Sequence, residues 1–264
     1  MPVPDLVPLL EKTAGVTVEV IDKLGSDGIL RFNFLYPPFD NIKARQALLY
    51  ATAQADYMTA VVGDARYWQA CSSFFPCGTP YARDAGGRLV TKDLAKARQL
   101  WREAGFDGAV AVLDPTDYGL HHQQALVLAD TLRQIGATVD LRAMDWTTLL
   151  AVRAKKDPPA QGGWNLFPTR TVVPDLMSPL LNDQMRTSGD KAWVGWPSDA
   201  ALEQLRDQWI AATTPEAQRD IAARLADRAL EFVPYVASGQ FTTPTAHRST
   251  VTAWSHRRSP SCGT

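Results

Sequence analysis

Pro37 and Pro38 stand between an aromatic-rich apolar run and a segment with helical spacing. Two fixed φ angles and two missing backbone donors end a strand at such a position. Residues 29–35 are therefore predicted to form a strand that stops there. Beyond the prolines, apolar residues recur at steps of three to four, and Asp40 or Asn41 can cap the first helical turn. A strand, a rigid corner and an amphipathic helix form the opening unit of an α/β domain.

Helical and strand patterns alternate along the rest of the chain. Their order and short loops predict an α/β fold with a mostly parallel sheet flanked by helices. A turn at residues 25–28 is expected to pair the first strand with the strand before Pro37, and residues 64–83 are expected to form a long ordered loop. The predicted strands cover residues 16–21, 29–35, 109–113, 139–144 and 234–244, and predicted helices begin near residues 41, 91, 120, 145, 198 and 214.

The charge balance gives no support for a nucleic-acid or anionic-membrane partner, because 27 basic and 28 acidic residues leave a net charge of −1. The first residues carry Asp5, Glu11 and Lys12 and lack the basic and apolar regions of a signal peptide. No charge-free apolar run approaches the roughly 20 residues of a membrane span. The chain is expected to be a soluble protein rich in tryptophan, with most of the eight indole rings in the core.

Common catalytic and nucleotide-binding motifs are absent from the sequence. Asp114, Asp117 and His121 lie between a predicted strand and a predicted helix, and they define the enzyme alternative, a hydrolase. The same aspartates equally suit turn formation and N-capping. His121 and His122 would point about 100° apart on a helix, so they are not expected to share a metal. No cofactor and no metal are predicted.

Several short motifs point to one known family. The aromatic strand with its asparagine, the run PPFDN and the following Arg-Gln-Ala-Leu helix occur together, as do a KARQLWREAGF helix end and a Pro-Tyr-Val run. These motifs resemble the second lobe of the extracellular solute-binding proteins of family 5, the dipeptide-, oligopeptide- and nickel-type receptors of ABC importers. The matching residues are Asn33, Pro37, Pro38, Phe39, Asp40, Asn41, Arg45, Gln46, Ala47, Leu48, Ala97, Leu100, Trp101, Glu103, Ala104, Gly105, Leu132, Ile135, Gly136, Val139, Pro234, Tyr235 and Val236.

The resemblance implies a periplasmic-binding-protein-like second lobe whose first lobe is missing from this chain. Residues 29–240 would form the C-terminal solute-binding lobe, and residues 1–28 would remain from the inter-lobe connection. Residues 241–264 would be a returning strand and a tail expected to be disordered. Met1 is interpreted as an internal methionine or as an early start in a truncated gene.

The function implied is that of a receptor, not an enzyme: the substrate-binding component of an ABC importer, which captures a peptide or similar small solute by lobe closure. Its partners would be that solute and the importer's permease subunits, with no nucleic acid, and the receptor would be a monomer. The full-length parent would be periplasmic or extracellular. A lobe kept only as an interaction module is a third alternative.

The solute site is predicted from the rule that ligands bind beyond the carboxyl ends of strands in open α/β sheets. Residues 114–118 and 164–170 are expected at one such edge. Trp164, in a Gly-Trp-Asn run that resembles a family strand leading to the cleft, would provide a wall unless it belongs to the core. Asn165 would offer an amide, Tyr118 a hydroxyl beside Asp117, and Arg170 a carboxylate clamp. The acidic amine anchor that dipeptide-type members carry shortly after this tryptophan is missing from residues 165–169.

Cys71 and Cys77 lie in the irregular segment, with residues on both sides that can turn. The two cysteines could form a disulfide or remain free thiols. The resemblance implies an oxidising compartment and therefore the Cys71–Cys77 disulfide. Cys262 is expected to stay unpaired.

Overall fold

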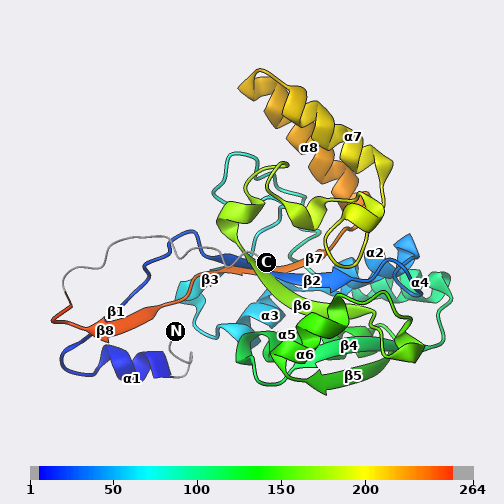
Figure 1. The fold of residues 1–264 in the computed structure, drawn as a ribbon. Coiled ribbons are helices and arrows are strands. Elements are labelled where there is room, and N and C mark those ends of the chain that lie inside the picture. The colour runs from blue at the N-terminus through cyan, green and yellow to red at the C-terminus, as the bar shows by residue number, and fades with distance from the viewer. Residues whose placement is uncertain (1–5, 252–264) are drawn as a thin grey trace.

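A six-stranded sheet with the order β3-β7-β2-β6-β4-β5 forms the centre of the protein, and a separate pair, β1 and β8, extends from one side (Figure 1). The computed structural model describes residues 6–251, so the expectations for the tail and Cys262 lie outside the described residues. The strands are β1 (Val16–Glu19), β2 (Ser26–Phe32), β3 (Trp68–Gln69), β4 (Ala109–Pro115), β5 (Thr138–Met144), β6 (Leu166–Val172), β7 (Val236–Phe241) and β8 (Thr245–Arg248).

The sheet is mixed, so the prediction of a mostly parallel sheet is wrong for about half of it. β2 runs antiparallel to both β6 and β7, and β3 runs antiparallel to β7. Only β4 pairs in parallel, with β5 on one side and β6 on the other. The α/β class and the flanking helices are confirmed. The antiparallel half consists of β2, β3 and β7 and the pairing of β2 with β6. Local sequence patterns do not reveal these pairings, because β6 and β7 come much later in the chain than β2.

The first strand does not form the predicted hairpin. β1 pairs with β8, with Val16 opposite Arg248, and the two strands form a ribbon outside the main sheet. The predicted turn residues 26–28 belong to β2 instead, and only Gly25 has a turn conformation, with φ +71°. At the same end of the sheet, where Ser26 of β2 lies opposite Phe241 of β7, the Thr242 amide donates to the Tyr67 carbonyl. The chain therefore enters the sheet beside Gly25 and leaves it beside Thr242.

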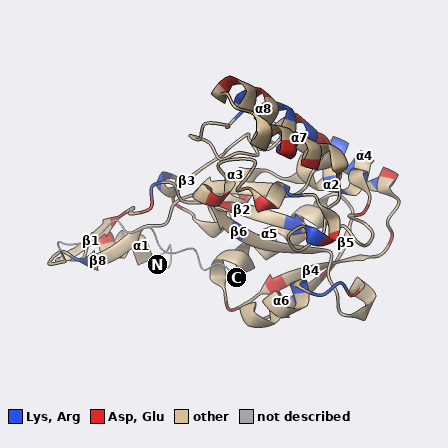
Figure 2. Ribbon diagram, turned by 45° about the horizontal axis from the view of Figure 1, so that its top comes forward, with Lys and Arg blue, Asp and Glu red and all other residues tan. Residues whose placement is uncertain are grey.

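Helices cover the sheet unevenly. On the face of Leu30 and Phe32, α2 to α5 build the large core, whereas residues 173–195 lie over the other face, and α7 and α8 form a hairpin that projects from the sheet (Figure 1). Acidic and basic residues are interspersed along that hairpin (Figure 2). The helices are α1 (Val7–Glu11), α2 (Ile42–Ala51), α3 (Gln54–Val61), α4 (Leu94–Ala104), α5 (Gly119–Gln134), α6 (Trp146–Arg153), α7 (Ala200–Ala211) and α8 (Pro215–Phe232).

Capping residues fix the helix starts as predicted. Asn41 accepts from the Lys43 amide at α2, Asp145 accepts from Thr148 at α6, and Thr214 accepts from Ala217 at α8. Each side-chain oxygen satisfies an amide that has no partner within its helix. None of the helices within residues 6–251 is long and apolar enough to cross a membrane.

Arg45 shows that one resembling motif has a structural role. Its guanidinium donates to the carbonyls of Phe39, Asp40 and Phe232, and it lies over the rings of Phe34 and Phe232 at 4.6 and 4.7 Å. Burial lowers the pKa of Arg45 to about 10. The arginine therefore fastens α2 to the proline corner and to the end of α8.

Candidate functional site

The carboxyl ends of the three parallel strands meet at one edge of the sheet. Polar and aromatic residues follow each of them: Asp117, Tyr118 and His121 after β4, Trp146 after β5, and Arg170 near the end of β6. We call these five side chains the rim. Ligand sites of open α/β sheets form at such an edge.

Three rings of the rim are stacked. The Tyr118 and His121 rings lie 4.7 Å apart, the Tyr118 and Trp146 rings 5.3 Å apart, and the His121 and Trp146 rings 5.0 Å apart. Asp117 accepts a hydrogen bond of 2.7 Å from the Trp146 amide, so it joins the β4 loop to the start of α6. The stack is a preformed apolar surface whose Tyr118 and Trp146 rings are partly exposed.

His121 is a neutral, buried member of the rim. Its Nδ1 donates to Gln124 Oε1 at 2.9 Å, and Gln124 Nε2 donates to Ser238 Oγ at 2.9 Å. Burial lowers the pKa of His121 to about 4. Gly28 leaves room for this chain of bonds, because a Cβ there would lie 2.1 Å from Ser238 Oγ. The histidine therefore acts as a neutral aromatic wall at physiological pH.

One arginine of the rim, Arg170, and one beside it, Arg153, place positive charge next to the stacked rings. Arg170 Nη1 donates to Ser26 Oγ at 3.0 Å, and the Arg153 guanidinium lies over Trp146, Phe167 and Trp193 at 5.8, 5.3 and 5.2 Å. Neither arginine forms an ion pair with a carboxylate within residues 6–251. Cations without a carboxylate partner beside exposed rings suit an anionic group on a small molecule.

Trp164 and Asn165 do not belong to the rim, and Trp164 takes the core position that was the alternative for it. Both are 0% exposed. Trp164 packs with Leu149 and Trp196 in a second core, and Asn165 bonds the Ala111 amide and the Pro37 carbonyl. They precede β6, whereas Arg170 lies four residues after Leu166, which is about 13 Å along an extended strand. The structure thus brings Asp117, Tyr118 and Arg170 to one edge and leaves Trp164 and Asn165 toward the other.

The three residues of the hydrolase alternative point to different partners. Asp114 is paired with His122 Nδ1 at 2.7 Å, His121 bonds Gln124, and Asp117 bonds a backbone amide. No two of the side chains of Asp114, Asp117 and His121 are hydrogen-bonded to each other. Within residues 6–251 no three metal-ligating side chains gather that could hold an ion.

Sequence reasoning missed Trp146 and misjudged His121. Trp146 directly follows a strand and a capping aspartate, so the rule that located Asp117 and Tyr118 also applied to it. His121 begins a predicted helix beside charged residues, yet it is only 2% exposed. A pair of histidines at a helix start carries no signal of burial, which here depends on Gln124 and the Trp146 ring.

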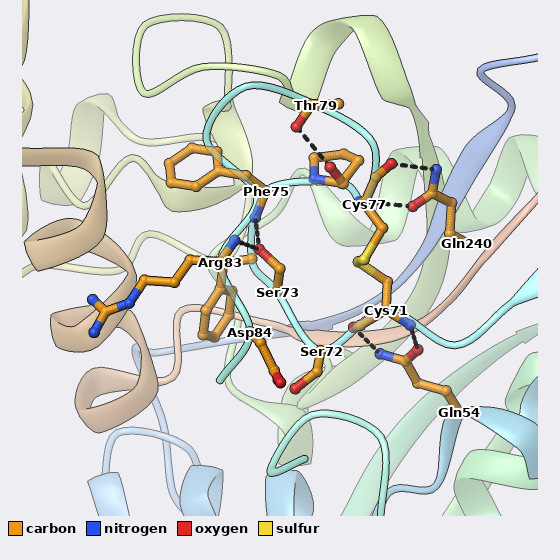
Figure 3. Close-up of a disulfide and its surroundings, with 12 residues drawn as sticks. Gln54, Cys71, Ser72, Ser73, Phe75, Cys77, Thr79, Arg83, Asp84 and Gln240 are labelled. Atoms are coloured by element: carbon orange, nitrogen blue, oxygen red, sulfur yellow. Dashed lines mark hydrogen bonds between the residues drawn. A yellow bond between two sulfur atoms is a disulfide. The ribbon is translucent and has the colours of Figure 1, made fainter. Parts of the chain in front are cut away.

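Cys71 and Cys77 form a disulfide with a sulfur–sulfur distance of 2.10 Å (Figure 3). A glutamine amide holds the backbone of each cysteine. Gln54 accepts from the Cys71 amide and donates to its carbonyl, and Gln240 does the same for Cys77 (Figure 3). The predicted irregular loop also contains β3, whose Gln69 lies opposite Gln240. The loop is therefore fixed to α3 and β7.

Replacing both Cys71 and Cys77 with serine is expected to lower the free energy of unfolding by about 2 kcal/mol, the loop-closure entropy of so short a loop. Urea unfolding of the oxidised chain and the double variant measures this difference. Dithiothreitol should reduce the stability of the unaltered chain by a similar amount and leave the variant unchanged. A variant as stable as the oxidised chain would contradict the prediction.

A cavity of about 190 Å³ lies where the ribbon meets the sheet. It is lined by Lys23, Arg66, Trp68, Gln240 and Thr242, among others. Arg66 is already paired with Asp64 and Glu11, whereas Lys23 forms no ion pair with a carboxylate within residues 6–251.

The lobe has the architecture of periplasmic binding proteins, as solved structures show. The Listeria monocytogenes ABC transporter substrate-binding protein CtaP matches with a TM-score of 0.81 at 21% identity, over 93% of this chain and 49% of that one. Helicobacter pylori DppA, a periplasmic binding protein in complex with the peptide STSA, matches with a TM-score of 0.78 at 18% identity, over 94% and 48%. These likenesses establish the fold.

Sequence comparison supplies the family. The model of bacterial extracellular solute-binding proteins, family 5, matches residues 1–187. A probable peptide ABC transporter periplasmic-binding protein of Sinorhizobium fredii is 32% identical over 251 residues, which cover 94% of this chain and 47% of the relative. The chain belongs to the bacterial extracellular solute-binding proteins of family 5. It spans about half the length of the relatives it matches.

Proposed function

We propose that this chain is the C-terminal lobe of a solute receptor, the substrate-binding component of an ABC importer. Membership of family 5 and the similarity to the S. fredii protein, a probable peptide ABC transporter periplasmic-binding protein, support this proposal. Such receptors enclose a solute between two lobes that close about a hinge. Residues 29–240 would form one lobe, and residues 1–28 and 241 onward would connect it to the other.

The rim is the surface that would meet the solute. The observation that carries this assignment is the position of Arg170, at the carboxyl end of a parallel strand with a single hydroxyl as its polar partner within residues 6–251. Its guanidinium can donate two hydrogen bonds to a carboxylate of the solute in bidentate geometry. Tyr118 and Trp146 would cover an apolar part of the solute. A peptide or a similar small acid fits this combination.

The proposed partners and compartment follow from the receptor role. The receptor would act as a monomer in the periplasm or outside the cell and would deliver its solute to the importer's permease subunits. It would carry out no catalysis. The Cys71–Cys77 disulfide is at home in an oxidising compartment. A first lobe encoded in frame upstream of the Met1 codon would support the proposal.

Binding of trialanine and of its C-terminal amide tests the role of Arg170. The isolated lobe supplies only half of the contacts, so the affinity is best measured by NMR titration at millimolar concentration. We expect the free acid to bind more tightly than the amide, and Arg170→Gln to weaken binding of the acid by about 10- to 100-fold, the effect of losing a charged hydrogen bond.

Arg133→Gln is the matched control, because Arg133 is exposed on α5 away from the rim. This variant should bind trialanine like the unaltered chain. If the Arg170→Gln variant binds the acid as tightly as the unaltered chain does, the rim is not part of the solute site. Hydrolysis of the peptide would contradict the receptor role.

A further inference from the structure

Asp27 is a nearly buried carboxylate without a partner. It lies in β2 between Thr171 of β6 and Gln240 of β7, so the three side chains share one face of the sheet. Asp27 is 5% exposed. Its carboxylate forms no hydrogen bond or ion pair with any side chain or amide in residues 6–251, and burial raises its pKa to about 7. A carboxylate desolvated in this way is costly unless a donor reaches it.

Two of the surrounding donors are already used elsewhere, whereas Asn182 Nδ2, close to Tyr235, is buried and has no partner within the described residues. The Gln240 amide is bonded to the Cys77 backbone, and the Tyr235 hydroxyl donates to the Phe74 carbonyl. Arg31 lies four residues after Asp27 on the same face of β2. It donates to the carbonyls of four other residues and lies over the Trp193 ring. Residues 6–251 therefore offer Asp27 no cation that is hydrogen-bonded or ion-paired to it.

A second acceptor without a donor lies nearby. Gln184 Nε2 donates to Thr171 Oγ1 at 3.3 Å, while Gln184 Oε1 is buried and has no partner within the described residues. Thr171 is the direct cross-strand neighbour of Asp27. Two oxygens that lack donors beside a hydroxyl call for a compact cation with several N–H groups. A hard metal ion would need more oxygen ligands than this single carboxylate and its neighbours provide.

We propose that Asp27 binds a primary ammonium group, with Gln184 and Thr171 as further acceptors, and that the solute supplies this group. The source in the solute rests on the proposed receptor function. Arg170 is opposite Gly28 in the register and Asp27 is opposite Thr171, so the acid-binding and amine-binding residues lie on opposite faces at the same end of β2. They would recognise two separate groups.

The test is a melting temperature at pH 8, where Asp27 is ionised. At about 0.2 M methylammonium chloride the chain should melt about 2–4 °C higher than in the same concentration of tetramethylammonium chloride, which has no N–H donor. Carbon-13 NMR of the Asp27 carboxyl carbon should show a lower pKa in methylammonium.

The Asp27→Asn variant should melt at the same temperature in both salts. Asp175→Asn, which alters an exposed carboxylate next to β6, should respond like the unaltered chain. Equal melting in the two salts, or a methylammonium effect that persists in Asp27→Asn, would overturn the proposal and leave Asp27 as a buried acid only.

The outcomes are separable from those of the Arg170 experiment. A chain that responds to methylammonium but does not distinguish trialanine from its amide keeps the ammonium site and loses the proposed solute-binding rim. The reverse pattern keeps the rim and removes the ammonium site. To assign the ammonium to the solute, trialanine should bind more tightly than N-acetyltrialanine, and Asp27→Asn should abolish that difference; equal binding by the unaltered chain would overturn the assignment.

Discussion

Replacing Arg31 with methionine is expected to lower the free energy of unfolding by about 4 kcal/mol, which is a large part of the stability of a domain. Arg31 is 0% exposed. It donates to the carbonyls of Val194, Gln184 and Trp193 at 2.7, 2.9 and 3.2 Å, and to that of Pro234 at 3.4 Å. Methionine keeps an unbranched apolar stem but has no donor, so these buried carbonyls would lose their partner.

The segment from residue 184 to 194 should be the part most affected. Arg31 is the side chain that joins this segment to the centre of the sheet, and burial lowers the pKa of its guanidinium to about 9. Urea unfolding followed by circular dichroism measures the loss. Arg133→Met, on an exposed position of α5, should change the stability by less than about 0.5 kcal/mol. A similarly small loss for Arg31→Met would show that the carbonyls find other donors.

Replacing Asp27 with asparagine is expected to stabilise the chain at pH 8 by up to about 4 kcal/mol and to leave its stability unchanged near pH 4. In the folded chain burial raises the pKa of Asp27 from 3.8 to about 7. Between these values the folded state keeps a proton that the unfolded state has lost. The contribution of this group is therefore fully present below pH 3.8 and is lost as the pH rises to 7.

The comparison between variant and parent separates the effect of Asp27 from that of a second group, His121, whose contribution to stability changes with pH in the opposite direction. Burial lowers the pKa of His121 from 6.5 to about 4, so its contribution grows as the pH rises through that range. His121 is present in both proteins and cancels in the difference. Urea unfolding at pH 4 and pH 8 provides the four values needed. An equal difference at the two pH values would show that Asp27 titrates normally, and Asp175→Asn should show no pH-dependent difference.

Local chemistry predicted the elements of this fold better than their pairing. The proline corner and the caps at Asn41, Asp145 and Thr214 act within a few residues, so they could be identified from neighbouring positions. The partners of β2 could not, because β6 and β7 come from distant parts of the chain. A buried strand has apolar residues on both faces and carries no mark of which strand lies beside it.

Pro168 explains why the solute site was placed around Trp164. A proline is unusual in a central strand, since it removes a ladder donor, and residues 164–170 were expected to follow a strand. In the structure Pro168 lies inside β6, opposite Leu30, and β6 pairs with β4 only at Leu166. The strand consequently begins after Trp164 and extends to Val172, which moves Arg170 to the edge and Trp164 to the core.

Asp27 illustrates a limit of a different kind. The run Gly25-Ser26-Asp27-Gly28 has the composition of a turn, because glycine, serine and aspartate all favour turns. Only the tertiary pairing with β6 and β7 makes it a strand and buries the carboxylate. The rim was partly predictable because Asp117, Tyr118 and Arg170 obey a general rule of sheet edges, whereas no single-sequence signal marks an aspartate without a partner.

The ribbon of β1 and β8 has a mechanical consequence. Because these strands are bonded to each other and join the sheet at Gly25 and Thr242, a tilt of the ribbon cannot pull on one junction without the other. Both junctions adjoin the end of β2 and β7 where Asp27 lies opposite Gln240. A torque applied through the ribbon would therefore reach Asp27 along the chain at Gly25 and Ser26, and would reach its cross-strand neighbour Gln240 along the chain at Thr242.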